Sequence, residues 1–80
     1  MEKDISETKD ISLAAYLYAT DQGVLSGRRK LQNGDTIFQF SPADKVGKLI
    51  SSYWNLTAPP IQPKRLFNCL RDIKDMIFKE

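Results

Sequence analysis

Apolar residues recur along this chain at two spacings, one typical of helices and the other typical of strands. After residue 10 the pattern has the 3.6-residue period of a helix of about three turns, and either Asp10 or Ser12 can serve as its N-cap. The positions that follow this period are Leu13, Tyr16, Leu17 and Thr20. We therefore expect a first helix shortly after residue 10, with one stripe packed on a core.

Two further helices are predicted in the second half of the chain. Ser41 is a favoured N-cap, Pro42 suits the first helical position, and an acidic residue follows three positions after the serine. This second helix should run from Pro42 to about Trp54, and we assign its whole apolar stripe to the core: Val46, Leu49, Ile50, Tyr53 and Trp54. Pro63 suits the start of a third helix, whose apolar positions are Leu66, Phe67, Leu70, Ile73, Met76 and Ile77.

A hairpin is predicted between the first two helices. Residues 24–32 and 35–40 flank Asn33-Gly34, which suits a two-residue type I′ turn because both residues tolerate positive φ. In that register Gln32 faces Asp35, and side chains alternate between two faces. One face then carries Leu25, Leu31, Phe38 and Phe40 with Arg29 and Thr36, and the other carries Arg28, Lys30, Gln32, Asp35, Ile37 and Gln39.

These elements predict a single small α+β domain over residues 11–80, in the order α-β-β-α-α, with a two-stranded antiparallel hairpin packed on the helices. A chain of 80 residues buries enough for one core but remains marginally stable. A two-stranded hairpin leaves both edges unpaired. We favour a homodimer in which a second copy adds strands at the hairpin edge, and the alternative is a monomer with the hairpin laid across the helices.

Charge separates the first ten residues from the rest of the chain. Residues 1–10 hold four acidic and two basic residues with little apolar content, and we interpret them as a flexible polar tail. The remaining residues hold ten basic and six acidic groups, so the predicted domain is basic. No apolar run approaches the roughly 20 residues that cross a bilayer, and the charged start lacks the apolar segment of a secretory signal. We expect a cytoplasmic protein with no membrane partner.

Residue combinations that carry catalysis or hold a cofactor are missing from the sequence. It contains no histidine and one cysteine, which argues against His-activated nucleophiles and ordinary zinc sites. Cys69 falls on the apolar flank of the third helix and is interpreted as a buried, inert thiol. Asp72 and Asp75 lie among cations and are interpreted as their solvated partners. We expect a non-enzymatic protein with no catalytic residue, metal or cofactor.

Arg28, Arg29 and Lys30 form the strongest candidate site, because three consecutive cations lead into a tight turn. A two-stranded basic ribbon can meet nucleic-acid phosphates and fits a DNA major groove. Arg29 is the weakest of the three, since the predicted register turns it toward the core. The candidate contacts on the helices are Lys45, Lys48, Arg71 and Lys74. Nucleic acid is therefore the first-choice ligand, although strand cations also serve simply to protect an exposed edge.

The alternative function is a protein-interaction adaptor or inhibitor that docks another chain on a sheet edge or helix face. Ile37 is the candidate contact for such a partner, because it is the apolar residue on an otherwise polar hairpin face. Charge reversal at Arg28 and Lys30 would remove nucleic-acid binding, whereas Ile37→Asp would remove a protein partner.

Several short motifs also occur together in the chain. They are Leu13-Ala14-Ala15-Tyr16-Leu17, Phe38-Gln39-Phe40, Tyr53-Trp54-Asn55, and the helical residues Pro63, Leu66-Phe67, Leu70-Arg71 and Ile73-Lys74. This combination resembles a family of small microbial and phage-associated domains of unknown function, over nearly all of the chain after residue 10. Leu56 departs from the small residue expected after the aromatic pair. The resemblance implies a small accessory protein of a phage or mobile element, and it marks Arg71 and Lys74 as polar positions beside the core.

Overall fold

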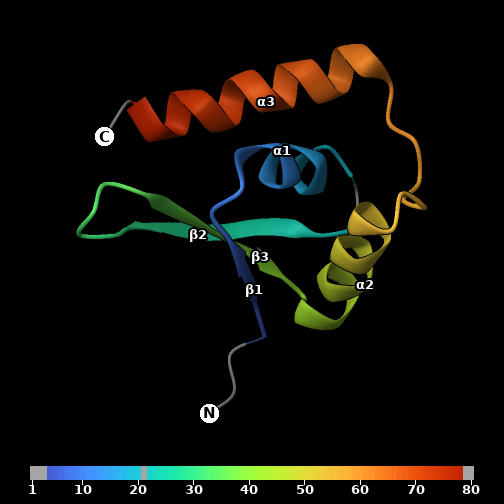
Figure 1. Ribbon diagram of the computed structural model, residues 1–80, viewed down its shortest axis with the longest axis horizontal. Coiled ribbons are helices and arrows are strands. Elements are labelled where there is room, and N and C mark those ends of the chain that lie inside the picture. The colour runs from blue at the N-terminus through green and yellow to red at the C-terminus, as the bar shows by residue number, and fades with distance from the viewer. Residues whose placement is uncertain (1–3, 21, 79–80) are drawn as a thin grey trace.

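A three-stranded antiparallel sheet forms one layer of the molecule (Figure 1). The computed structural model describes residues 4–20 and 22–78. The strands are β1 (Ser6–Thr8), β2 (Val24–Lys30) and β3 (Thr36–Ser41), in the spatial order β1-β3-β2. The α+β fold is confirmed, and the predicted order α-β-β-α-α is preceded by one short strand.

The helices build two further layers and one flank. Helix α1 (Ile11–Ala19) lies between the sheet and α3 (Pro63–Phe78), while α2 (Ala43–Trp54) lies at one end of the sheet (Figure 1). Asp10 caps α1, because its Oδ1 accepts the Leu13 N–H at 3.0 Å. Because α1 is the middle layer, it is buried on nearly every side. It therefore buries more of its surface than the single stripe that we predicted. Its buried residues are Leu13, Ala14, Ala15, Tyr16, Leu17 and Ala19.

The core lies where the sheet and the helices meet. Phe38 and Phe40 of β3 are completely buried, and so are Val46 of α2 and Ile73 of α3. Leu17 of α1 lies in the same cluster. The core therefore draws on all three layers, and α3 is fixed to it along one side only.

The segment that we predicted to be a flexible tail supplies β1, so that prediction is wrong for residues 6–8. Ser6 pairs with Phe40 and Thr8 pairs with Phe38. Asp4 also accepts the Ala43 N–H on its Oδ1 at 3.0 Å, at the first turn of α2. A strand is held by backbone hydrogen bonds, which low apolar content does not prevent. Residues 1–3 lie outside the described part of the chain.

The hairpin is present, but its turn is one residue longer than predicted. The Leu31 N–H donates to Asp35 O at 2.7 Å, and the Gly34 N–H donates to Leu31 O at 3.0 Å. A type I′ turn needs positive φ at both central residues, whereas Asn33 is not among the positive-φ residues and Gly34 has a φ of 99°. The loop therefore consists of residues 32–34. Its observed pairs are Arg28 with Phe38, Arg29 with Ile37, and Lys30 with Thr36.

This one-residue shift exchanges the two faces of β2 near the turn. Arg28 and Lys30 share the face of the buried β3 residues, and Arg29 lies on the opposite face with Ile37. The predicted orientations of all three cations are therefore wrong. A register irregularity between Leu25 and Gly27 returns Leu25 to the side of Phe40, as predicted.

The ranges of α2 and α3 follow the sequence closely, with two corrections at α2. Ser41 is the last residue of β3 and Pro42 is the N-cap residue, without a side-chain hydrogen bond. Trp54, which we assigned to the core, is 60% exposed and packs edge-on against Tyr53, with ring centroids 5.1 Å apart. The last turn of α2 extends past the core, so the apolar stripe continues into solvent. No helix among residues 4–20 and 22–78 is long and apolar enough to span a bilayer.

Candidate interaction surface

The cations of the hairpin are divided between two faces of the sheet. On one face, Arg29 Nη2 lies 3.2 Å from Glu7 Oε1, and Gln39 Nε2 donates to Glu7 Oε2 at 2.8 Å. On the other face, Arg28 lines a depression of about 390 Å³ that it shares with Asp72 and Asp75 of α3. The structure therefore places Arg28 and Arg29 in separate surroundings, each of which includes carboxylates.

The other candidates from the sequence also lie on different elements. Lys30 is exposed near the hairpin turn, and Lys45 and Lys48 are exposed on α2. Ile37 is half-buried in the sheet face opposite the helices, beside Arg29. The fold therefore does not bring all of the hairpin cations together in a single patch.

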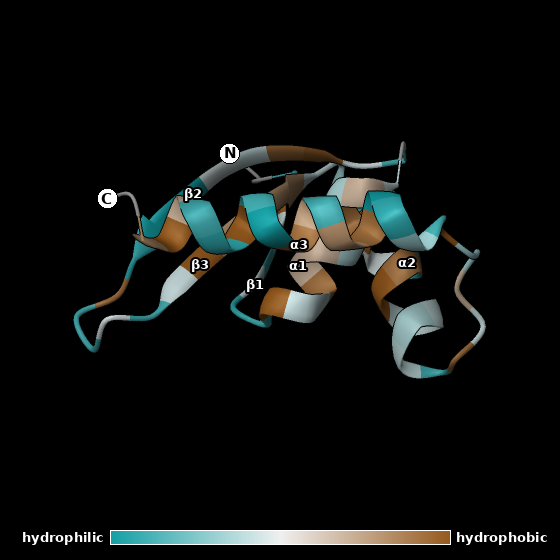
Figure 2. Ribbon diagram, turned by 90° about the horizontal axis from the view of Figure 1, so that it is seen from above, coloured by the Kyte–Doolittle hydropathy of each residue, from teal (hydrophilic) through white to brown (hydrophobic). Residues whose placement is uncertain are grey.

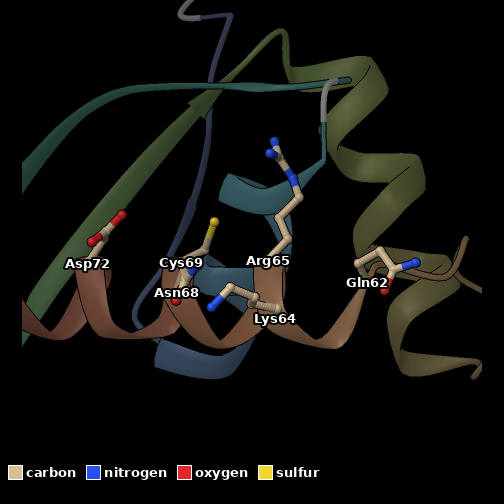
Figure 3. A pocket seen from close by; sticks show the side chains of 6 residues that line it. All are labelled: Gln62, Lys64, Arg65, Asn68, Cys69 and Asp72. Carbon is tan, nitrogen blue, oxygen red and sulfur yellow. The ribbon is translucent and has the colours of Figure 1, made fainter.

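One side of α3 faces the start of β2 across an open depression of about 570 Å³ (Figure 3). Arg65, Cys69 and Asp72 point into it from the same side of the helix (Figure 3). Arg65 Nε donates to Ala19 O at 2.6 Å, at the C-terminal end of α1, where a cation is favoured by the helix dipole. This arginine therefore joins α3 to α1.

Cys69 in this depression is half-buried rather than fully buried. Burial raises the pKa of the Cys69 thiol, Arg65 lowers it and Asp72 raises it. Because burial is the largest of these effects, the thiol stays protonated at neutral pH and lacks nucleophilic character. The depression thus carries a structural contact and an unactivated thiol.

The opposite flank of α3 carries a row of exposed residues with a regular spacing. Their separations alternate between three and four residues, which is the spacing of a seam between two packed helices. We call these five residues the α3 seam: Lys64, Phe67, Arg71, Lys74 and Phe78. Lys64, in the first turn of the helix, also lines the depression that contains Arg65 and Cys69. Phe67 is 62% exposed and Phe78 is 82% exposed. Seen from above α3, hydrophilic and hydrophobic stretches alternate along the exposed side of the helix (Figure 2).

Two adjoining depressions border the α3 seam. The larger one, of about 440 Å³, contains Phe67, Leu70 and Phe78 together with Arg71 and Lys74. The smaller one, of about 190 Å³, shares Phe67 and Leu70 and reaches the rings of two tyrosines. The seam and the smaller depression thus form one continuous surface, which joins two exposed phenylalanines to an aromatic hollow.

The wall of the smaller depression is built by Tyr16 of α1 and Tyr53 of α2, whose ring centroids lie 5.6 Å apart. The Tyr16 hydroxyl donates to Pro59 O at 2.6 Å, in the connection between α2 and α3. Burial raises the pKa of Tyr16, so its hydroxyl remains a donor. The wall is therefore held by elements that the core fixes in place.

The positive charges of the α3 seam are available to a partner. Within the described residues, the structure records no ion pair for Lys64, Arg71 or Lys74, whereas Arg29 is paired with Glu7. Asp75 is the acidic residue in the lining of the larger depression. The α3 seam therefore combines exposed aromatic rings with cations that have no recorded ion pair in the described part of the chain.

Sequence reasoning found part of this surface. It named Arg71 and Lys74, and the structure brings both into one depression. It assigned Phe67 to the buried stripe and made no assignment for Phe78, although both are exposed. The alternating spacing from Lys64 to Phe78 was the signal that could have identified the seam. The described residues contain no group of three or more side chains suited to holding a metal ion.

Comparison with known proteins agrees with the resemblance noted in the sequence. The family described as "Domain of unknown function (DUF5659)" matches residues 3–79, so the chain belongs to this family. No curated protein and no solved structure gave a match.

Proposed function

We propose that this member of the DUF5659 family is a non-enzymatic protein-binding module, and that it binds its partner on the α3 seam and the adjoining aromatic depression. The observation that carries the proposal is the exposure of Phe67 and Phe78 on one flank of a helix whose other flank is packed on the core. This proposal develops the adaptor function that the sequence left as its alternative.

The energetic argument rests on the two phenylalanines. Burying a large apolar side chain is worth roughly 1.5–3 kcal/mol. Phe67 and Phe78 are mostly exposed in the isolated chain, so a partner that covers them would gain most of this free energy. Aromatic residues and arginine are also enriched at the centres of protein interfaces, where they fill depressions on the partner. Arg71 lies between the two rings along the helix. The α3 seam thus has the composition of a protein contact.

Nucleic-acid binding stays a prediction, and the geometry supports it less. The predicted site needed Arg28 and Lys30 on the face turned away from the core, whereas the observed register places both on the face of the buried β3 residues. Arg29 is also engaged by Glu7. Cations do occur on the α3 seam, but the adjoining hollow is lined mainly by tyrosine and aliphatic side chains. Such a lining suits an inserted apolar side chain better than a phosphate backbone.

The test places a photo-crosslinking amino acid at position 67 of the full chain, in cells that naturally produce the protein. The matched control carries the same amino acid at Val24, which is 65% exposed on β2 and lies outside the α3 seam. We expect one dominant protein to crosslink from position 67 and not from position 24. That protein, once purified, should bind the unmodified chain at least about tenfold more tightly than it binds the variant with Phe67→Ala and Phe78→Ala.

Nucleic acid is tested in parallel with labelled DNA and RNA at about 50 and 200 mM salt, since phosphate contacts weaken steeply over this range. Equal crosslinking from positions 67 and 24 would contradict the proposal. So would salt-dependent oligonucleotide binding that survives the Phe67→Ala and Phe78→Ala changes.

A further inference from the structure

The chemistry of the α3 seam restricts the kind of protein that fits it. Three of its five residues are cations, and none is acidic. Each cation is exposed and has no recorded ion pair within the described residues. Asp75 is the acidic residue that lines the larger depression beside these cations, so positive charge still exceeds negative charge on this surface. A partner that covers it is therefore expected to bring carboxylates, because cations buried without partners are strongly unfavourable.

The spacing of the α3 seam restricts the shape of the partner. Separations of three and four residues keep side chains in line along a helix, so that a second helix can pack against them at a shallow angle. The 16 residues of α3 span about 24 Å, enough for three to four turns of a partner helix. The row is straight and exposed throughout, and the adjoining hollow offers room for an apolar side chain.

We infer that the α3 seam binds an acidic amphipathic helix of another protein, which lies along α3. Apolar side chains of that helix contact Phe67 and Phe78, and its carboxylates contact Lys64, Arg71 and Lys74. This inference rests on the proposed function and specifies the partner of the same surface.

A second copy of this chain is a poorer occupant. Pairing two α3 seams would bring three cations of one copy against three of the other, while each copy supplies the carboxylate of Asp75 in the lining of the larger depression. Like charges in close contact are destabilising, and they become costlier as the surface loses water. Charge complementarity therefore favours a different, acidic chain.

The inference is tested with three labelled synthetic peptides of about three heptads each. The first has leucine at the two seam positions of each heptad and glutamate at the flanking positions. The second replaces each glutamate with lysine, and the third scrambles the first so that its leucines no longer form one face. Binding to the full chain is measured by fluorescence anisotropy. We expect the acidic amphipathic peptide to bind at least about tenfold more tightly than either of the others.

Charge reversal in the domain provides the second arm. Arg71→Glu with Lys74→Glu should reverse the preference, so that the lysine peptide binds more tightly than the glutamate peptide. The matched control is Lys45→Glu with Lys48→Glu, which makes the same change of charge at two exposed positions of α2 with the same spacing. The control should keep the original preference. Circular dichroism of each variant checks that the fold is retained.

The outcomes separate this inference from the proposed function. Equal binding of the acidic and scrambled peptides would contradict the inference that the partner is an acidic helix. So would a change of peptide preference in the Lys45 and Lys48 variant as large as that in the Arg71 and Lys74 variant. The proposed function survives that result if the crosslinked protein still loses affinity with Phe67→Ala and Phe78→Ala. Both fail if a single-stranded oligonucleotide outcompetes the acidic peptide and its binding is lost when Arg71 and Lys74 are reversed.

Discussion

At the residue scale, Leu56 occupies a backbone conformation that normally selects glycine. Its φ is 63°, and it directly follows Asn55, the C-cap of α2. The Leu56 N–H donates to Tyr53 O at 3.2 Å, and the Thr57 N–H donates to Ser52 O at 2.9 Å. These two bonds define a Schellman motif, in which the left-handed position is usually glycine. Leu56 is also 92% exposed, so packing does not compensate for the strain.

Leu56→Gly should therefore stabilise the domain. The left-handed conformation costs an ordinary residue roughly 1–2 kcal/mol, and the greater freedom of glycine in the unfolded chain cancels part of the gain. We expect the free energy of unfolding to rise by about 0.5–1 kcal/mol, as measured by urea denaturation. Leu56→Ala serves as the control, since it shortens the side chain but keeps the strained backbone. A loss of stability in the glycine variant would show that the leucine side chain makes a stabilising contact.

Tyr16 links stability to pH at the same scale. Burial raises its pKa above the ordinary value of 10.0, so the folded state holds the phenolic proton more tightly than the unfolded state does. The stabilisation is complete below about pH 10 and is lost as the pH rises through the folded pKa. We expect denaturation midpoints to fall above pH 10 in the unmodified chain.

Tyr16→Phe should remove much of that alkaline decline. At neutral pH the variant should lose about 0.5–1.5 kcal/mol, because the hydrogen bond from the hydroxyl to Pro59 O is absent. Titration of Cys69 contributes in the same direction, so both chains are compared in a Cys69→Ser background. An identical pH profile for the tyrosine and phenylalanine chains would contradict this explanation.

At the scale of elements, β1 and Asp4, two residues before it, tie the start of the chain to α2. Asp4 accepts the Ala43 N–H, which belongs to the first turn of α2 and has no partner within the helix. Asp4→Ala should lower the free energy of unfolding by about 1 kcal/mol, the usual effect of losing a cap. Glu7→Gln offers a comparison on β1 itself, because an exposed ion pair with Arg29 contributes less than about 1 kcal/mol. Thermal denaturation of the two variants checks that Asp4→Ala loses more stability than Glu7→Gln.

The hairpin register gives a prediction that nuclear magnetic resonance can test directly. Since Leu31 and Asp35 form a hydrogen-bonded pair, the alternation along the strands makes Arg28 and Phe38 a non-hydrogen-bonded pair. Their Cα atoms should lie about 4.5 Å apart, close enough for a strong nuclear Overhauser effect between the two α protons. The register predicted from a two-residue turn would place that signal elsewhere, so its absence would contradict the three-residue loop.

At the scale of the whole molecule, α3 has one flank for the core and one for solvent. Ile73 is completely buried in the cluster that joins the three layers, whereas Phe67 is mostly exposed on the seam. Ile73→Ala should cost roughly 2–5 kcal/mol, a large part of the stability expected for a domain of this size. Phe67→Ala should change the free energy of unfolding by less than about 0.5 kcal/mol. Equal losses for the two variants would mean that the seam belongs to the core.

The pattern of apolar residues was sufficient to predict the three helices, the hairpin and the α+β class. Pro63 begins α3 and Asp10 caps α1, as their sequence signals predicted. Such signals act between residues a few positions apart, so all of the interacting groups can be identified from the sequence. The cations Arg71 and Lys74 were also identified from the sequence. The resemblance to a family of unknown function was also noted from the sequence, and the family match over residues 3–79 agrees with it.

Only the tertiary structure decided the features that depend on distant residues. Residues 6–8 became a strand because β3 offered an unpaired edge, and no property of the segment itself specifies that partner. The register of β2 followed from one extra loop residue, which turned Arg28 to the face of the buried β3 residues and Arg29 to the opposite face, the reverse of the prediction. The exposure of Trp54 and Phe67 was set by where the core ends, because helical periodicity gives the direction of a side chain and not what it meets.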